Sequence, residues 1–273
     1  MAEDAVNVVL VGATGRMGQA LIRVLPEFPR LRLQAAITLA DHPDVGVDAG
    51  VHAGKEQLGV PLSTDLAAAL PGARVVVDFS SANATAVTLA ACTQARVPLL
   101  IGTTGLDAAI QSQLQRAALQ IPLLVAANTS LALNLLLELV RQAAAALPLG
   151  YDIEIFETHH RHKVDAPSGT ALALAQAAAA GRGTSLPQAP QLTGAVPGAR
   201  ERGAIGFAVA RGGDVVGEHE VRFLGTGEQI KLAHVATDRN IFARGALAAA
   251  LWLSAQGAGR YAMADVLSLK TKA

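Results

Sequence analysis

Apolar runs alternate with helical stretches through the first half of the chain. Runs rich in Val, Leu and Ile, which predict strands, cover Val6–Val11, Leu31–Ile37, Val75–Phe79, Leu99–Ile101 and Pro122–Ala126. Periodic apolar positions between them predict helices over Met17–Leu25, Ala84–Gln94 and Asp107–Leu119. Continuously apolar strands that alternate with helices are typical of a parallel sheet covered on both faces. Residues 1–130 are therefore predicted to form an α/β domain with a doubly wound parallel sheet.

The pattern changes after a long apolar-faced helix, expected over Leu131–Leu147. Later runs no longer alternate with helices and predict strands over Ile153–Phe156, Ile205–Ala210, Val215–Phe223 and Gln229–Ala236. Gly212–Asp214 predicts a hairpin turn between the second and third of these strands, and Gly225–Gly227 predicts one between the third and fourth. A Gly- and Pro-rich stretch, residues 181–203, predicts a long loop, and helical periodicity returns over Arg239–Gln256. Residues 131–239 are thus predicted to form a second, α+β domain, with residues 240–273 returning to the first.

A glycine pattern joins the first predicted strand to the first predicted helix. Gly12-Ala13-Thr14-Gly15-Arg16-Met17-Gly18 follows Val11 directly, inside a strand–turn–helix–strand unit. Such glycines permit a tight turn and a close approach of the backbone to a pyrophosphate at the helix N-terminus. Alone, the pattern would fit an ordinary tight turn; in this context it predicts a dinucleotide site of the Rossmann type.

Small polar residues follow three later strands of the same domain. They are Ser80-Ser81, Gly102-Thr103-Thr104 and Asn128-Thr129-Ser130. Ordinary turn chemistry would explain any one of these groups. In an open parallel sheet, however, ligands bind beyond the carboxyl ends of the strands, so the three groups together are expected to line the cofactor crevice.

The densest chemistry lies in the segment Glu157–Ala171, which reads Glu-Thr-His-His-Arg-His-Lys-Val-Asp-Ala-Pro-Ser-Gly-Thr-Ala. Its imidazoles and its ammonium group would each need a partner if buried, so we expect a cationic loop with no reason for burial. Ser168-Gly169-Thr170 then begins an Ala- and Leu-rich stretch, and hydroxyls beside free N–H groups at a helix start suit an anion. Proton-transfer groups beside an anion site indicate an acid/base enzyme that acts on a carboxylate or a phosphate.

Two plainer interpretations of this segment are possible. One is a surface patch of histidines without a role. The other is a zinc site, but His159, His160 and His162 are too close in sequence to converge easily, and the single cysteine offers no thiolate partners. No metal is therefore expected, and acid/base chemistry is the favoured interpretation.

The amino-acid composition limits the kinds of partner that the chain is expected to bind. Lys and Arg together number 22, as do Asp and Glu, and aromatic residues make up 3% of the 273 residues. Balanced charge and few aromatics argue against a nucleic-acid partner or an anionic membrane surface. No signal peptide and no membrane-spanning run is visible in the sequence. The single cysteine, Cys92, lies in an apolar run, so we expect a buried residue rather than a nucleophile, and a cytoplasmic protein.

Together these motifs resemble the dihydrodipicolinate reductase family over essentially the whole chain. Residues 11–18, Asp78-Phe79-Ser80, residues 101–105 and residues 126–130 are similar to its cofactor motifs. Glu157–Ala171 matches its substrate motif, Glu-x-His-His-x-x-Lys-x-Asp-Ala-Pro-Ser-Gly-Thr-Ala, at every fixed position. The resemblance implies a Rossmann domain, a mixed-sheet domain and a homotetramer. It also implies NAD(P)H-dependent reduction of a small dicarboxylated ring, 4-hydroxy-tetrahydrodipicolinate by way of dihydrodipicolinate, to tetrahydrodipicolinate in diaminopimelate and lysine biosynthesis.

Residue roles follow from the same resemblance. His159 matches the general acid, since an imidazole pKa lies near working pH, and Lys163 matches the second catalytic group. Binding of the substrate carboxylates is implied for His160, Ser168, Gly169 and Thr170, and Thr104 would join them. His162 falls at a position that the motif leaves open. Cofactor binding is implied for Gly12, Ala13, Thr14, Gly15, Arg16, Met17, Thr38, Gly102, Thr103, Thr104, Ala126, Ala127, Asn128 and Thr129.

One departure from the family concerns the cofactor. Many members have an acid followed by a basic residue at the end of the second strand, where this chain has Thr38-Leu39. An acid there would bind the ribose 2′-hydroxyl of NADH, and an arginine would bind the 2′-phosphate of NADPH. Arg16, with Thr38 and His42 assisting, is the expected phosphate contact, which favours NADPH slightly or use of both cofactors; Asp41 is the remaining nearby acid.

Three rival functions fit parts of the same pattern. A Rossmann dehydrogenase of amino acids would share the glycine turn but would not need Asp165–Thr170. Aspartate-semialdehyde dehydrogenase chemistry needs a thiolate in the site, which Cys92 does not supply from a predicted helix. A non-enzymatic NAD(P)H sensor would not need both His159 and Lys163 beside an anion site.

Overall fold

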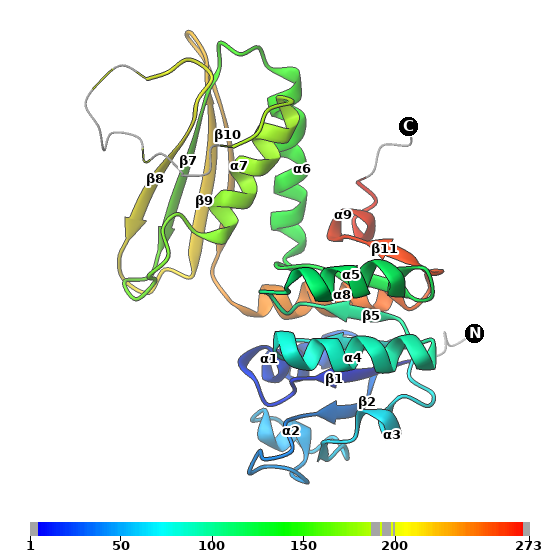
Figure 1. The fold of residues 1–273 in the computed structure, drawn as a ribbon. Helices are drawn as coiled ribbons and strands as arrows, with labels where there is room; N and C mark the ends of the chain where they lie inside the picture. Colours follow the sequence, from blue (N-terminus) through cyan, green and yellow to red (C-terminus); the bar gives the residue numbers. More distant parts are fainter. Residues whose placement is uncertain (1–4, 187–191, 193–197, 199, 270–273) are drawn as a thin grey trace. The chain divides into compact units, whose positions relative to one another are not determined.

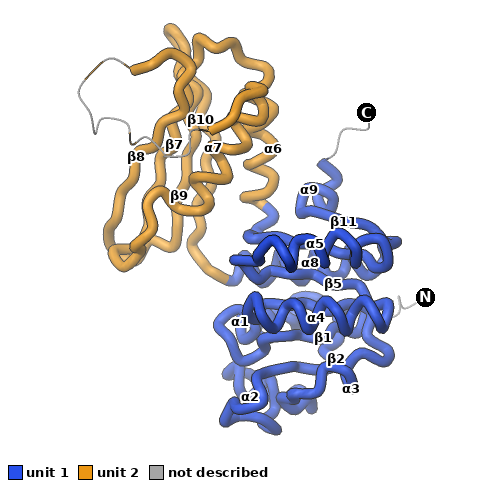
Figure 2. Tube along the Cα trace, in the orientation of Figure 1, with its two compact units in different colours: residues 1–131, 240–273 blue, residues 132–239 orange. Residues whose placement is uncertain are grey.

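The computed structural model describes residues 5–186, 192, 198 and 200–269. The chain divides into two compact units, coloured separately in Figure 2. Unit 1 comprises Met1–Leu131 and Asn240–Ala273, and unit 2 comprises Ala132–Arg239. Within the described ranges, no helix is both long and apolar enough to cross a membrane.

Unit 1 is built on a seven-stranded sheet in which every strand pair is parallel. The strand order is β11-β6-β5-β4-β1-β2-β3. The strands are β1 (Val6–Val11), β2 (Leu31–Ile37), β3 (Leu62–Ser63), β4 (Val75–Asp78), β5 (Leu99–Ile101), β6 (Pro122–Val125) and β11 (Gly259–Tyr261). This arrangement confirms the predicted doubly wound sheet.

Helices cover both faces of this sheet (Figure 1). Because successive side chains of a strand point to opposite faces, Val8 and Leu10 of β1 enter one core and Val9 and Val11 enter the other. The first core is closed by α1 (Arg16–Val24) and α8 (Asn240–Leu253), and the second by α4 (Ala82–Ala95) and α5 (Ala108–Ala118). Double coverage explains why the strands are apolar throughout.

Several short elements of unit 1 were not predicted, because each lacks enough residues to show a period. They are the 3₁₀ helix η1 (Leu25–Glu27), α2 (Ala49–His52), α3 (Leu66–Ala69) and α9 (Met263–Val266), together with the two short strands at the sheet edges, β3 and β11. The longer predicted helices are present, with ends that differ by one to three residues.

Unit 2 contains a mixed four-stranded sheet with the order β10-β9-β7-β8. The strands are β7 (Asp152–His159), β8 (Ile205–Arg211), β9 (Gly217–Leu224) and β10 (Gln229–Ala236). Strand β7 pairs in parallel with β8 and antiparallel with β9, and β9 pairs antiparallel with β10. The hairpin predicted at Gly225–Gly227 is therefore confirmed.

The hairpin predicted at Gly212–Asp214 was wrong. The strands β8 and β9 that flank this turn are not neighbours, because β7 lies between them and pairs with both. A short glycine turn can join antiparallel strands that are adjacent or that have one strand between them. The local sequence does not distinguish these cases, since the intervening strand comes from about fifty residues earlier in the chain.

Two helices pack on one face of this sheet, α6 (Leu131–Ala146) and α7 (Gly169–Gly181) (Figure 1). Leu136 and Val140 of α6 and Leu174 of α7 meet Ile155 and Phe223 of the sheet in one core. Part of the predicted long loop, residues 181–203, lies outside the described residues. Strand β7 is longer than predicted and ends only at His159, so the first histidine of the cluster belongs to the sheet.

Candidate active site

The glycine turn of unit 1 connects β1 to α1 in the way that a dinucleotide site requires. Gly12 has φ +80°, and a Cβ there would lie 2.6 Å from the carbonyl oxygen of Phe79. A Cβ on Gly18 would lie 2.3 Å from the carbonyl oxygen of Gly12, so only glycine permits this close packing. Helix α1 begins at Arg16 after Gly15, and its first N–H groups have no partner within the helix. This helix start can accept the negative charge of a pyrophosphate.

The end of β2 is tied to the glycine turn by two hydroxyls. The Oγ1 atoms of Thr14 and Thr38 lie 2.7 Å apart, and the side chain of Thr38 is buried. Arg16 and Leu39 are both exposed. No acid stands at position 38 or 39.

The other predicted cofactor residues follow the carboxyl ends of strands that lie side by side in this sheet. Gly102 follows β5, and a Cβ there would lie 2.1 Å from the Phe79 ring. Thr104 is exposed, whereas Thr103 and Thr129 are buried. The hydroxyl of Thr129 donates a 2.6 Å hydrogen bond to the carbonyl of Phe242, so this side chain is engaged inside unit 1.

An acidic residue, Asp78, also lies at this end of the sheet; it belongs to the motif Asp78-Phe79-Ser80, for which no residue role was expected. Asp78, the last residue of β4, is fully buried and accepts hydrogen bonds from the backbone N–H and the hydroxyl of Ser80. Burial raises the pKa of Asp78, against the opposing effect of Ser80. Cys92 is buried as expected, and burial raises the pKa of its thiol to about 12, which leaves it unreactive.

In unit 2, His159 lies at the end of β7 with 7% of its surface exposed. The expectation of a wholly exposed cationic loop was therefore wrong for this residue. Burial and the nearby His219 lower the pKa of His159 to about 4, although Glu157 opposes the shift. In the free protein the imidazole is neutral at pH 7, which corrects the expectation of a pKa near working pH.

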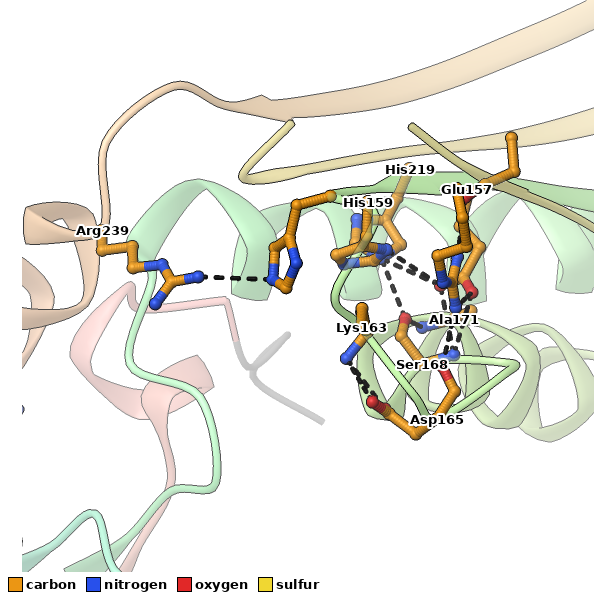
Figure 3. A network of polar contacts seen from close by, with 11 residues as sticks. Glu157, His159, Lys163, Asp165, Ser168, Ala171, His219 and Arg239 are labelled. Carbon is orange, nitrogen blue, oxygen red and sulfur yellow. Dashed lines mark hydrogen bonds and ion pairs between the residues drawn. The ribbon is translucent and has the colours of Figure 1, made fainter. Parts of the chain in front are cut away.

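Buried Glu157 is the centre of the network drawn in Figure 3. The backbone N–H of Ser168 donates to both of its carboxylate oxygens at 3.1 Å, and Nη2 of Arg211 lies 3.0 Å from Oε1. Nδ1 of His159 and Nε2 of His219 each lie 3.6 Å from Oε2. Burial raises the pKa of Glu157, but hydrogen bonds from His219, Ser168 and Arg211 outweigh it and lower the pKa to about 2. The carboxylate is therefore charged at neutral pH.

The predicted anion site at the start of α7 has the expected helical geometry. Ser168 is the N-cap, and its Oγ accepts a 3.1 Å hydrogen bond from the backbone N–H of Ala171. The same Oγ lies 3.1 Å from Nε2 of His219, and Ser168 is buried. Gly169 is exposed and Thr170 half-buried, so these two residues present the accessible part of the helix start.

The remaining cations lie on the loop between β7 and α7. Lys163 is ion-paired with Asp165, with Nζ 2.7 Å from Oδ1 and 2.8 Å from Oδ2 (Figure 3). Nε2 of His160 lies 3.4 Å from Nη2 of Arg239. His162, to which we assign no role, is exposed and shares an open pocket with residues of the same unit, namely His160, Arg161, Gly213, Asp214 and Arg239.

Glu157, His159 and His219 are close enough together to contact one metal ion. Zinc accepts a carboxylate with two imidazoles, but here the carboxylate already neutralises the guanidinium of Arg211 and accepts the N–H of Ser168. We therefore assign no metal to them. Sequence reasoning missed Arg211 and His219, which come from β8 and β9; the only local signal was the alternation of polar and apolar residues around His219.

Comparison with known proteins decides the family. The family model for the N-terminal part of dihydrodipicolinate reductase matches residues 6–129, and the model for its C-terminal part matches residues 132–267. The chain belongs to the dihydrodipicolinate reductase family. The 4-hydroxy-tetrahydrodipicolinate reductases of Sinorhizobium medicae and Methylocella silvestris are each 49% identical to it. The alignments cover 98% and 97% of this chain, and 100% and 98% of the respective relatives.

A solved structure supports the fold of this reductase family member. Dihydrodipicolinate reductase from Paenisporosarcina sp. TG-14, solved with dipicolinate bound, matches with a TM-score of 0.77 and 24% sequence identity. The match covers 94% of this chain and 97% of that one. Family membership over both units separates the chain from the rival amino-acid dehydrogenases and sensors.

Proposed function

We propose that this chain is a 4-hydroxy-tetrahydrodipicolinate reductase of diaminopimelate and lysine biosynthesis. It uses NAD(P)H to reduce the dicarboxylated ring, by way of dihydrodipicolinate, to tetrahydrodipicolinate. The observation that carries the proposal is the complete substrate motif, Glu157–Ala171, folded so that His159 and the start of α7 share the buried carboxylate of Glu157. The name of the 49% identical relatives agrees with this activity.

The 4-hydroxy ring loses water to give dihydrodipicolinate, whose reduction requires one hydride and one proton. A bound nicotinamide supplies the hydride, which adds to a conjugated C=C–C=N system of the ring. The electron pair that the hydride displaces moves toward the ring nitrogen, and the electron-rich product must collect a proton. The protein must therefore hold two carboxylates and place an acid beside the ring.

His159 is the proposed proton donor. Its pKa of about 4 in the free protein leaves it neutral, but a substrate with two carboxylates brings negative charge to the imidazole and favours protonation. We infer that His159 takes up a proton as the substrate binds and passes it to the ring. Lys163, once released from Asp165 by the substrate, would stabilise developing negative charge and assist the proton transfer.

The carboxylates of the substrate are assigned to the start of α7 and to His160. The backbone N–H of Gly169, an exposed residue, and the hydroxyl of Thr170 suit one carboxylate, since a helix start attracts negative charge. Ser168 is buried, and its polar atoms are engaged by Glu157, Ala171 and His219, so it would contribute by capping the helix start that presents Gly169 and Thr170. The dipicolinate in the Paenisporosarcina enzyme is a ligand of the same dicarboxylate class.

The cofactor is assigned to the glycine turn and the sheet end of unit 1. The residues proposed to contact it are Gly12, Ala13, Thr14, Gly15, Arg16, Met17, Thr38, Gly102, Thr103, Thr104, Ala126, Ala127, Asn128 and Thr129. Both NADPH and NADH are accepted in this proposal, because no acid at position 38 or 39 repels a 2′-phosphate. Exposed Arg16 gives NADPH a slight advantage.

A homotetramer in the cytoplasm is the proposed state of the enzyme. Leu224 of β9 and Val235 of β10 lie on the sheet face opposite α6 and α7 and are 36% and 59% exposed in the single chain, which suits a sheet face that a second copy covers. Mass photometry at nanomolar concentration tests the assembly, and a monomer would contradict it.

Steady-state oxidation of NADPH and NADH, followed by absorbance, tests the activity. The ring substrate is made freshly by the preceding synthase. Turnover that depends on this ring supports the proposal. Cofactor binding without turnover would favour a sensor, and turnover only with an amino acid would favour a different dehydrogenase.

A further inference from the structure

Strand register places a row of ionisable side chains across the sheet of unit 2. His219 of β9 is the register partner of Glu157 on β7 and of His234 on β10. His159, two residues beyond Glu157, lies on the same face of β7 and has Arg211 of β8 as its register partner. Alternation therefore directs Glu157, His159 and His219 to one face, where the start of α7 meets them (Figure 3).

His219 connects the two parts of the candidate site. Its Nε2 lies 3.1 Å from Oγ of Ser168, the N-cap of α7, and 3.6 Å from Oε2 of Glu157. Its ring also packs edge-on against the ring of His159, with centroids 5.0 Å apart. Nε2 of His219 faces Ser168 and Glu157 and its Nδ1 is buried, so the residue is poorly placed to meet a substrate itself.

We propose that His219 and Glu157 are positioning residues, which hold the ring of His159 and the start of α7 in one fixed arrangement. This inference rests on the proposed reductase activity for its consequence, but its geometric part concerns the free protein. Neither residue touches the ring being reduced. The carboxylate of Glu157 orients His159, and His219 joins that carboxylate to the helix start that receives the substrate.

Orientation by Glu157 fixes the tautomer of His159. Nδ1 of His159 is buried, points toward the charged carboxylate and has no hydrogen-bond partner within the described structure. A carboxylate there favours the hydrogen on Nδ1, so Nε2 is left to receive a proton and deliver it to the substrate. The 3.6 Å separation is long for a hydrogen bond, as is common before a substrate closes the site.

Gly217 completes the support of the ring. A Cβ at this position would lie 3.1 Å from Nε2 and 3.3 Å from Cδ2 of His159, so the imidazole rests directly on the glycine backbone. The His159 ring is thus bounded by Glu157, His219 and Gly217. A ring held on three sides needs little reorganisation to present Nε2 in one direction.

Other ionisable groups face Glu157, His159 and His219, and they contribute to any pH dependence of the His159 imidazole. Arg211 faces Glu157 from β8, and Lys163 and Arg211 both act electrostatically on His159. On the other side, half-buried His234 of β10 faces His219. From α7 the neighbour of His219 and Glu157 is the uncharged Ser168.

The test compares three variants of the full-length enzyme: His219→Gln, Glu157→Gln and a control, Glu218→Gln. Glu218 is adjacent to His219 on β9 but exposed, so the control removes a carboxylate from the same strand without touching the network. NMR of imidazole-labelled protein, with the His159 signals assigned from His159→Gln, gives the tautomer and pKa of His159 without any turnover. Profiles of kcat against pH give the functional consequence.

The expected shifts have opposite signs. Glu157→Gln removes a negative charge, so the pKa of His159 falls and the Nδ1–H tautomer is no longer favoured. His219→Gln removes a neighbour that lowers the pKa of His159, so that pKa rises. In both variants kcat falls by about 10-fold or more, the lower end of the value of a positioned acid, while KM for NADPH stays near that of the wild type. In each variant, the alkaline limb of the plot of kcat against pH shifts with the pKa of His159.

The control should match the wild type in every measurement. A His219→Gln enzyme that loses thermal stability but keeps the wild-type tautomer, pKa and kcat profile would overturn the proposal, since this is what a purely structural residue does. If Glu157→Gln does not fold, His219→Gln decides alone. Wild-type protein that shows the Nδ1–H tautomer but no turnover would contradict the proposed activity while supporting the geometry.

Discussion

Protonation of His159 should make the free protein lose stability as the pH falls, and a variant can isolate the effect. The pKa of this imidazole is about 4 in the folded chain and 6.5 when unperturbed. The unfolded chain therefore binds a proton between these values and the folded chain does not. By linkage, the free energy of unfolding falls as the pH is lowered through 6.5, and the loss is complete below about pH 4.

The size of the effect follows from the same two values. Each pKa unit corresponds to about 1.4 kcal/mol, so the full difference has a ceiling of about 3 kcal/mol. At pH 5 the linkage relation gives about 2 kcal/mol, and residual hydration of the ring reduces this toward about 1 kcal/mol. His159→Gln removes the titrating group, so its stability should fall less than that of the wild type between pH 7.5 and pH 5.

Urea unfolding at both pH values, followed by far-ultraviolet circular dichroism, measures this difference. Trp252, the only tryptophan of the chain, reports separately on unit 1 by fluorescence. His162→Gln is the matched control, because His162 is exposed on the adjacent loop and should behave like the wild type. Equal losses of stability in wild type and His159→Gln would refute the claim that His159 is buried in its neutral form.

Further predictions concern chemistry and specificity. His159→Gln and Lys163→Ala should each lower kcat by about 10²-fold without changing cofactor affinity, as expected for a positioned proton donor, and near-normal kcat in folded variants would exclude these roles. Thr170→Val should raise KM for the ring and weaken competitive inhibition by a pyridine dicarboxylate together; unchanged inhibition would place the carboxylate elsewhere. Arg16→Ala should disfavour NADPH relative to NADH by about 1–2 kcal/mol, and Thr38→Glu should restore a preference for NADH, as measured by both KM values. Equal loss of both cofactors in Arg16→Ala would show that another group reads the ribose.

The sequence predicted the features whose signals are local. The turn Gly12–Gly18 was recognisable because its glycines lie between an apolar strand and a periodic helix, and the structure shows the close backbone contacts that require them. The helix start at Ser168 was recognisable from a hydroxyl residue before an Ala- and Leu-rich stretch, and Ser168 is its N-cap.

The environment of His159 could not be predicted in this way. Its burial depends on Gly217 and His219 of β9 and on Arg211 of β8, which are separated from it by more than fifty residues. The same long-range pairing made the predicted hairpin at Gly212–Asp214 wrong, because a strand from earlier in the chain separates the two that this turn joins. Local patterning gives the faces of a strand but not its neighbours.

Deuterium transfer tests the central claim most directly. NADPH in which both hydrogens at C4 of the nicotinamide are replaced by deuterium is incubated with the enzyme and freshly made ring substrate in ordinary water, and the ring product is analysed by mass spectrometry. The account predicts tetrahydrodipicolinate with one deuterium, formed by the wild type and about 10²-fold more slowly by His159→Gln. Oxidation of the cofactor without deuterium in the ring, or no oxidation in the presence of the ring, would contradict it.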